Sequence, residues 1–118
     1  MPAFIDQLRQ RCRTCGTPVL VGLDPRLESL PPAIRPSEAN PSSKSIAAAY
    51  DTFCRGVIDV VAPLVPAVKP QAAFFEEIGP AGMSVLAGLI DYAQSQGLLV
   101  ILDGKRNDIG STASAYAA

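Results

Sequence analysis

The segment Leu98 to Ile109, LLVILDGKRNDI, limits the possible folds of this chain more than any other part of the sequence. Its opening apolar run is too short for a buried helix and rich enough in branched side chains for a buried strand over 98–103. Three ionisable residues follow, Asp103, Lys105 and Asp108. Charges at the end of a buried strand are costly unless they are paired or used. Residues two apart in a strand face the same way, so Asp103 and Lys105 are predicted to point into one cavity.

The rest of the chain repeats a strand followed by a helix. The apolar patterns and helix-stop signals predict helix 3–14, strand 19–23, a proline-rich loop 25–43, a helix beginning at Ser42 or Ser43 and ending before Pro63, strand 65–69, a loop with a helical turn 71–78, helix 80–96, strand 98–103 and a helix beginning near 108–111. Such repeated units imply a parallel sheet with helices packed on it. The predicted strands end on Asp24, Lys69 and Asp103, which is typical of a shared site at the top of a (β/α) barrel.

Composition excludes several classes of function. The net charge of -1 provides no basic surface for nucleic acid and no polybasic patch for a membrane surface. No apolar run approaches the roughly 20 residues of a membrane span, and the amino terminus lacks the apolar core of a signal peptide. We therefore expect a cytoplasmic protein. The chain has no histidine, so acid–base chemistry must come from Lys, Asp, Glu, Tyr or Cys.

The cysteines do not predict a metal site. Cys12 and Cys15 form a lone C-x-x-C, and a structural zinc site needs about four ligands, which this chain does not offer. The sequence leaves the role of this pair open. Cys54 falls on the apolar stripe of a predicted helix and is predicted to be a core residue.

The number of predicted strands bears on domain organisation. A (β/α)8 TIM barrel has eight strands and about 250 residues, whereas three strands are predicted here. Residues 114–118 continue a helical pattern without a stop signal. We therefore expect residues 1–118 to be the N-terminal part of a single TIM-barrel domain, its first three βα units.

Three segments of the chain resemble one enzyme family. The pattern D-x-K-x-x-D at 103–108 lies within LLVILDGKRNDIGSTASAYA at 98–117, and VGLDPR at 21–26 and VKPQAAFFE at 68–76 precede it. These segments, in this order, resemble orotidine 5′-phosphate decarboxylase of the longer bacterial subgroup. The resemblance implies decarboxylation of orotidine 5′-monophosphate to UMP, the last step of pyrimidine synthesis, with no metal or organic cofactor.

The resemblance also implies roles for individual residues. The family's alternating Lys–Asp–Lys–Asp array matches Lys69, Asp103, Lys105 and Asp108. In a homodimer, the last aspartate of that array reaches into the partner subunit's site. The aspartate that binds the ribose hydroxyls matches Asp24, and further residues of the cross-subunit segment match Ile109 and Thr112.

The chemistry of the residues agrees with this assignment. Loss of carbon dioxide leaves a carbanion, which a cationic lysine stabilises and then protonates, so Lys105 is the expected proton donor. Neighbouring carboxylates keep that lysine protonated. The phosphate-binding segments of the family come from later strands, so we expect the 118-residue chain alone to be inactive.

Other interpretations of the same residues remain. Asp103 and Lys105 can form a structural ion pair, Asp108 can cap a helix, Lys69 can lie at the surface, and Asp24 can form an Asp-Pro turn. A metal-dependent hexulose-phosphate synthase or keto-gulonate-phosphate decarboxylase shares D-x-K-x-x-D. A non-catalytic α/β fragment is a further alternative.

Overall fold

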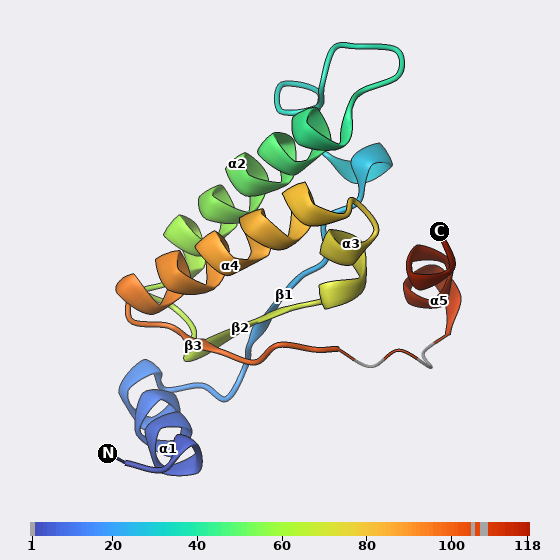
Figure 1. The fold of residues 1–118 in the computed structure, drawn as a ribbon. Coiled ribbons are helices and arrows are strands. Elements are labelled where there is room, and N and C mark those ends of the chain that lie inside the picture. Colours follow the sequence, from blue (N-terminus) through green and yellow to red (C-terminus); the bar gives the residue numbers. More distant parts are fainter. Residues whose placement is uncertain (1, 105, 107–108) are drawn as a thin grey trace.

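The computed structural model describes residues 2–104, 106 and 109–118, and its elements follow the predicted order (Figure 1). They are α1 (Phe4–Cys15), β1 (Val21–Leu23), the short 3-10 helix η1 (Leu27–Ser29), α2 (Ser43–Val61), β2 (Ala67–Pro70), α3 (Ala72–Glu76), α4 (Pro80–Ser95), β3 (Leu99–Val100) and α5 (Gly110–Ala117). The strands form one parallel sheet in the order β1-β2-β3. The predicted α/β fold, the first three βα units of a TIM barrel, is confirmed.

The sheet pairing continues beyond the regular part of β3. The N–H of Ile101 donates to the carbonyl of Val68 at 3.0 Å, and the N–H of Asp103 donates to the carbonyl of Pro70 at 3.0 Å. The predicted strand over 98–103 therefore exists as a hydrogen-bonded segment, although only Leu99 and Val100 have regular strand geometry. The predicted strands over 19–23 and 65–69 both begin two residues too early.

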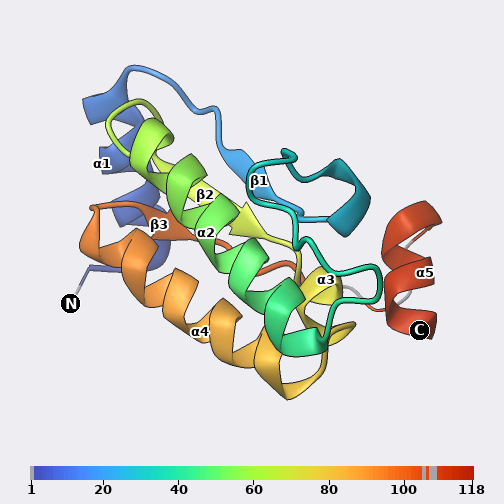
Figure 2. The same ribbon diagram turned by 90° about the horizontal axis from the view of Figure 1, so that it is seen from above.

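Helices α2 and α4 lie side by side over one face of the sheet (Figures 1 and 2). The core between them and the sheet contains buried side chains from all these elements, including Leu23, Val68, Cys54, Ile58 and Leu89. The predicted core position of Cys54 is confirmed, since its side chain is fully buried. Burial raises the pKa of its thiol to about 12, so this cysteine stays protonated at neutral pH.

The segment around β3 is less buried than the sequence predicts. Leu98 is buried, but residues 99–101 are only half-buried and Leu102 is 51% exposed. Within the described residues β3 is an edge strand, so no neighbouring strand covers its outer side. An apolar run of this kind is typical of a strand with neighbours on both sides. Because β3 has a neighbour on one side only among the described residues, its side chains are less buried than predicted.

The helix ends follow the predicted signals. The N–H of Ser45 donates to the Oγ of Ser42 at 3.1 Å, so Ser42 is the N-cap of α2. Gly16 follows α1 with a φ of 73° and Gly97 lies just beyond α4 with a φ of 84°, in the left-handed region that glycine tolerates. None of the described helices combines the length and apolar character needed to cross a membrane.

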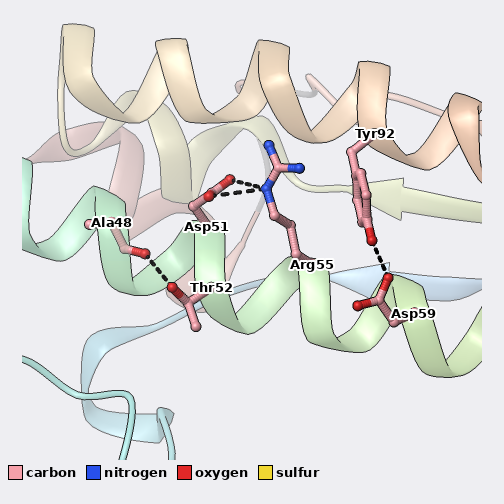
Figure 3. A network of polar contacts seen from close by, with 6 residues as sticks. All are labelled: Ala48, Asp51, Thr52, Arg55, Asp59 and Tyr92. Atoms are coloured by element: carbon pink, nitrogen blue, oxygen red, sulfur yellow. Dashed lines mark hydrogen bonds and ion pairs between the residues drawn. The ribbon is translucent and has the colours of Figure 1, made fainter.

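A polar network holds α2 and α4 together on their outer side (Figure 3). The Nε of Arg55 donates to Oδ1 of Asp51 at 2.9 Å, and its guanidinium lies 4.6 Å from the centre of the Tyr92 ring. The Tyr92 hydroxyl donates to Asp59. The network therefore joins the two helices that cover the sheet.

Candidate active site

Strand alternation separates the site side chains from the core. Leu23, Val68 and Val100 belong to or pack against the core under the helices. Successive strand side chains point to opposite faces, so Gly22 and Lys69 lie on the face of the sheet away from this core. Alternate residues of the segment from β3 to Asp103 lie on that face too. Gly22 is paired in register with Lys69, and a Cβ built on Gly22 would lie 3.1 Å from Oδ1 of Asp24. The carboxylate of Asp24 therefore lies against this part of the sheet.

Lys69 and Asp103 meet at the carboxyl edge of the sheet. The Nζ of Lys69 lies 3.9 Å from Oδ2 of Asp103, and both side chains are only partly exposed, at 41% and 27%. The shared edge predicted for Asp24, Lys69 and Asp103 is thus present in the structure. Opposite charges at this edge can hold and polarise a charged ligand.

The pKa of Asp24 depends on the charged groups at the same edge of the sheet. Partial burial is the main cause that raises the pKa of its carboxyl above the usual value, although the residue retains solvent exposure. The cationic side chains of Lys69 and Arg26 oppose this change, and the nearby Asp103 carboxylate adds to it. Asp24 thus lies within electrostatic reach of both members of the ion pair.

Gln71 lies beside these residues in the structure, although it is not among the site residues predicted from the sequence. Gln71 forms a parallel bridge with Asp103, and its N–H donates to the carbonyl of Leu23 at 3.1 Å. Its side chain is 5% exposed, and its Oε1 has no hydrogen-bond partner among the residues that the structure describes. The signal that could have found it is its position two residues after Lys69, on the same face.

Arg106 anchors the segment that follows β3. Its Nη2 donates to Oε1 of Glu76 at the end of α3, and its guanidinium lies 5.5 Å from the centre of the Tyr116 ring on α5. Neither Arg106 nor Glu76 belongs to the site residues predicted from the sequence. The structure shows that the pair links the D-x-K-x-x-D segment to both neighbouring helices.

The other predicted site residues have different surroundings. Lys105 and Asp108 lie outside the described residues. Ile109 is 83% exposed, whereas Thr112 on α5 is only 9% exposed. Helix α5 packs on α3 through Ala115, Ala73 and Phe74. Thr112 is therefore largely enclosed within its own chain, while the side chain of Ile109 is largely exposed.

A separate cleft of about 510 Å³ lies beside the carboxyl edge, between η1 and the helices α2, α3 and α5. Its lining includes Arg26, Tyr50, Phe74, Glu77 and Ser111, but neither Lys69 nor Asp103. Burial, with a smaller contribution from Glu77, raises the pKa of Tyr50 to about 12. This tyrosine is consequently neutral at physiological pH and acts as a wall of the cleft.

The cysteine pair lies far from the candidate site. Cys15 shares a surface with Pro63 and Gln96, which precede β2 and β3, so it lies toward the amino ends of the strands. Cys12 and Cys15 are half-buried free thiols. In the part of the chain that the structure describes, no group of three or more His, Cys, Asp or Glu residues is arranged to hold a metal ion.

Comparisons with known proteins agree on one family. A family model described as "Orotidine 5'-phosphate decarboxylase / HUMPS family" matches residues 17–118. An orotidine 5′-phosphate decarboxylase of Rhodopirellula baltica is 56% identical over 117 residues, which cover 99% of this chain and 39% of that protein. The enzyme of the same name from Streptomyces coelicolor is 39% identical over 117 residues, with the same coverage.

Solved structures give the same answer for the fold. The OMP decarboxylase of Leishmania donovani superposes with a TM-score of 0.65 at 34% identity, covering 98% of this chain and 38% of that chain. The UMP synthase of the same organism superposes with a TM-score of 0.67, covering 99% of this chain and 22% of that one. The chain thus spans about two fifths of the length of the curated relatives named above.

Proposed function

The chain belongs to the orotidine 5′-phosphate decarboxylase / HUMPS family, and from that premise we propose that it forms the N-terminal part of a single TIM-barrel domain that converts orotidine 5′-monophosphate to UMP. The observation that carries the proposal is the pairing of Lys69 with Asp103 at the carboxyl edge, with Asp24 beside them. This edge is where the fold places catalytic residues. The remaining βα units and the phosphate contacts belong to the rest of such a barrel.

The proposed chemistry needs no imidazole. Departure of carbon dioxide leaves an electron pair on the pyrimidine ring carbon, and the ammonium of Lys105 stabilises that charge and then transfers a proton to the carbon. Asp103 and Asp108 hold the lysine in its charged form, since neighbouring carboxylates favour the ammonium. Lys69 lies on β2, the central strand of the described sheet, and pairs with Asp103 of the array. The reaction as proposed uses no metal and no organic cofactor.

In this proposal the remaining site residues bind the substrate or complete its pocket. Asp24 accepts hydrogen bonds from the ribose hydroxyls. Asp108 and Ile109 serve the neighbouring subunit of a homodimer, and the 83% exposure of Ile109 supports that placement. Thr112 lies in the same segment, where its burial supports a role in holding α5. We place the enzyme in the cytoplasm with its nucleotide substrate.

A metal-dependent member of the same family is the alternative to exclude. Hexulose-phosphate synthase and keto-gulonate-phosphate decarboxylase relatives share D-x-K-x-x-D but stabilise an enediolate with a metal ion. The relatives described above are named for orotidine 5′-phosphate decarboxylation, which favours the metal-free reaction. A chelator distinguishes the two, since it removes activity only from the metal-dependent enzyme.

The proposal is tested by completing the barrel. In the fusion protein, residues 1–118 are joined to the part of the Rhodopirellula baltica relative that follows its matched segment. We expect the fusion protein to release carbon dioxide from orotidine 5′-monophosphate and to keep its rate after treatment with EDTA. The intact relative serves as the positive control. A folded fusion protein without turnover, or one that EDTA inactivates, would contradict the proposal.

A further inference from the structure

We infer that Arg106 is a positioning residue of the proposed decarboxylase, whose ion pair with Glu76 fixes the loop that carries Lys105. The inference rests on the proposed function and adds two residues, Arg106 and Glu76, to those that the sequence motifs assign. It begins from an ion pair between residues 30 positions apart in the chain. This pair joins the position directly after the proposed proton donor to the end of α3.

Helix α3 provides a firm base for this ion pair. Its first four residues, Ala72, Ala73, Phe74 and Phe75, are all buried. The Phe75 ring also contacts the Tyr50 ring of α2 edge to face, with 6.3 Å between the ring centres. Closely packed side chains of this kind cannot shift independently of their neighbours. The carboxylate at the end of α3 is therefore held at a fixed place relative to the sheet.

The same helix is attached to the chain on both sides of Lys105. Before the lysine, the N–H of Ala72 donates to the carbonyl of Asp103 at 2.9 Å. After the lysine, Nη2 of Arg106 donates to Oε1 of Glu76. The proposed proton donor is thus enclosed in the chain by two attachments to one helix.

The chain between these two attachments depends on the second one. It consists of Gly104 and Lys105, and glycine restricts the backbone less than any other residue. A Cβ built on Gly104 would meet no described atom within 4 Å, so packing at this glycine does not hold the backbone either. The attachment at Arg106 therefore limits where the lysine can lie.

A second contact restricts the arginine itself. Its guanidinium lies 5.5 Å from the centre of the Tyr116 ring on α5, which is within the range of a cation–π interaction. Helix α5 packs in turn on α3, where Ala115 contacts Ala73 and Phe74. Arg106 is thus held between two helices that also hold each other.

The exposure of the ion pair favours a positioning role over a structural one. The side chains of Arg106 and Glu76 are 66% and 24% exposed. Ion pairs in contact with water contribute little to stability, because water and dissolved ions screen the charges. Catalysis is more sensitive, since a catalytic group misplaced by about 1 Å can lower the rate by about 10²-fold. Loss of the pair should therefore slow turnover without unfolding the protein.

The test uses Arg106→Met, Glu76→Met and the double variant of the fusion protein, because methionine keeps an unbranched side chain and removes the charge. Arg9→Met is the matched control, since Arg9 forms an exposed ion pair with Asp6 on α1. Arg106→Met is also combined with Lys105→Ala. Steady-state kinetics with orotidine 5′-monophosphate separates KM from kcat. Calorimetry measures the binding of UMP, and thermal unfolding without ligand reports stability.

We expect Arg106→Met and Glu76→Met each to lower kcat by about 10- to 100-fold, with KM and UMP affinity close to those of the unsubstituted fusion protein. The double variant should be no slower than the slower single variant, because both substitutions remove one interaction. In the Lys105→Ala protein, Arg106→Met should cause no further loss, since the ion pair acts through that lysine. The unfolding temperature should fall by less than about 3 °C, and Arg9→Met should leave every measurement unchanged.

Four results would overturn the inference. The first is an unchanged kcat in Arg106→Met, and the second is a double variant whose loss is the product of the two single losses. The third is a further loss on adding Arg106→Met to Lys105→Ala, which would mean that the arginine acts on the substrate or on the fold. The fourth is a larger fall in the unfolding temperature, which would assign the pair a structural role.

The unsubstituted fusion protein separates this inference from the proposed function. If that protein fails to decarboxylate orotidine 5′-monophosphate, the proposed function fails and the inference fails with it. If it turns over the substrate and any of the four results is found, the inference alone is overturned.

Discussion

Among single residues, Asp24 shows most clearly how a site residue differs from a structural one. The pKa of its carboxyl is raised from the usual 3.8, mainly by burial, so folding favours the protonated form. The resulting destabilisation is absent at a pH well below 3.8, grows as the pH rises from 3.8 to the raised pKa, and stays constant above it. A charge that weakens the fold at the carboxyl edge is expected where it binds a ligand.

We therefore predict opposite effects of Asp24→Asn on stability and binding in the fusion protein. The variant should be more stable at pH 7, and this gain should disappear as the pH is lowered toward 3, because asparagine does not titrate. UMP affinity should fall by about 10- to 100-fold, the effect of losing hydrogen bonds to a charged group. Urea unfolding across pH and calorimetry with UMP measure the two. Asparagine can replace aspartate in an Asp-Pro-type turn, so the substitution keeps the turn. Lower stability of the variant at pH 7 would therefore assign the carboxylate of Asp24 a structural role.

The residues that the sequence could and could not predict differ in a physical way. Asp24, Lys69 and Asp103 each end an apolar run, so parallel pairing alone brings them to one edge. Gln71 follows a proline and is the N-cap of α3, and its burial beside Asp103 depends on the packing of the whole chain. The contacts of Arg106 with α3 and α5 depend on side-chain placement in three dimensions.

Between elements, the backbone of α3 closely approaches Gly82 near the start of α4. A Cβ built on Gly82 would lie 2.0 Å from the carbonyl oxygen of Phe75, a backbone atom that cannot move aside cheaply. On the same helix, a Cβ on Gly88 would meet only a flexible Arg55 nitrogen at 3.6 Å. Glycine is therefore required at the first position and not at the second.

We predict that Gly82→Ala in the fusion protein lowers the free energy of unfolding by about 1–3 kcal/mol, the usual effect of overpacking. The matched variant Gly88→Ala should raise it by about 0.5–1 kcal/mol, because alanine is the better helix former. Urea unfolding measures both. Equal effects of the two substitutions would show that α3 and α4 do not approach each other as described.

The sequence predicted the three strands and the helices α1, α2, α4 and α5, but not all of their limits. The short helix η1 lies in a segment predicted as a loop, and α3 in one predicted as a loop with a helical turn. Periodicity and caps placed α1, α2 and α4 to within about a turn, because Ser42, Gly16 and Gly97 provide local signals. The strand ends were less accurate, since pairing partners decide where regular geometry begins. The burial of β3 was overestimated because an apolar run carries no information on whether a neighbouring strand is present.

At the scale of the whole molecule, the ion pair of Lys69 and Asp103 lies at the carboxyl edge of a sheet of three described strands. Lys69 and Asp103 are partly exposed to solvent, and water weakens their interaction. We predict that the 118-residue polypeptide alone shows no decarboxylation and no saturable UMP binding by calorimetry. Its uncovered strand edge should also make it aggregate with increasing concentration. Clear saturable binding would show that these βα units hold a complete nucleotide site.

Assembly gives a second prediction at this scale. If Asp108 serves the neighbouring site, subunits of the fusion protein carrying Lys105→Ala and subunits carrying Asp108→Ala are each inactive. Mixing them should restore some activity, because one site of each hybrid dimer contains both unsubstituted residues. Mass spectrometry verifies that the subunits exchange. Exchange without any rescue would show that Asp108 acts only within its own chain.

The most direct measurement of the central claim is the rate at which Lys105→Ala fusion protein releases carbon dioxide from orotidine 5′-monophosphate. We predict a loss of at least about 10²- to 10⁴-fold in kcat, because the proton donor and the charge that stabilises the carbanion are both removed. Lys44→Ala, at an exposed lysine of α2, is the matched control and should keep full activity. Near-normal turnover by a folded Lys105→Ala protein would contradict the claim that this chain supplies the catalytic lysine of a decarboxylase.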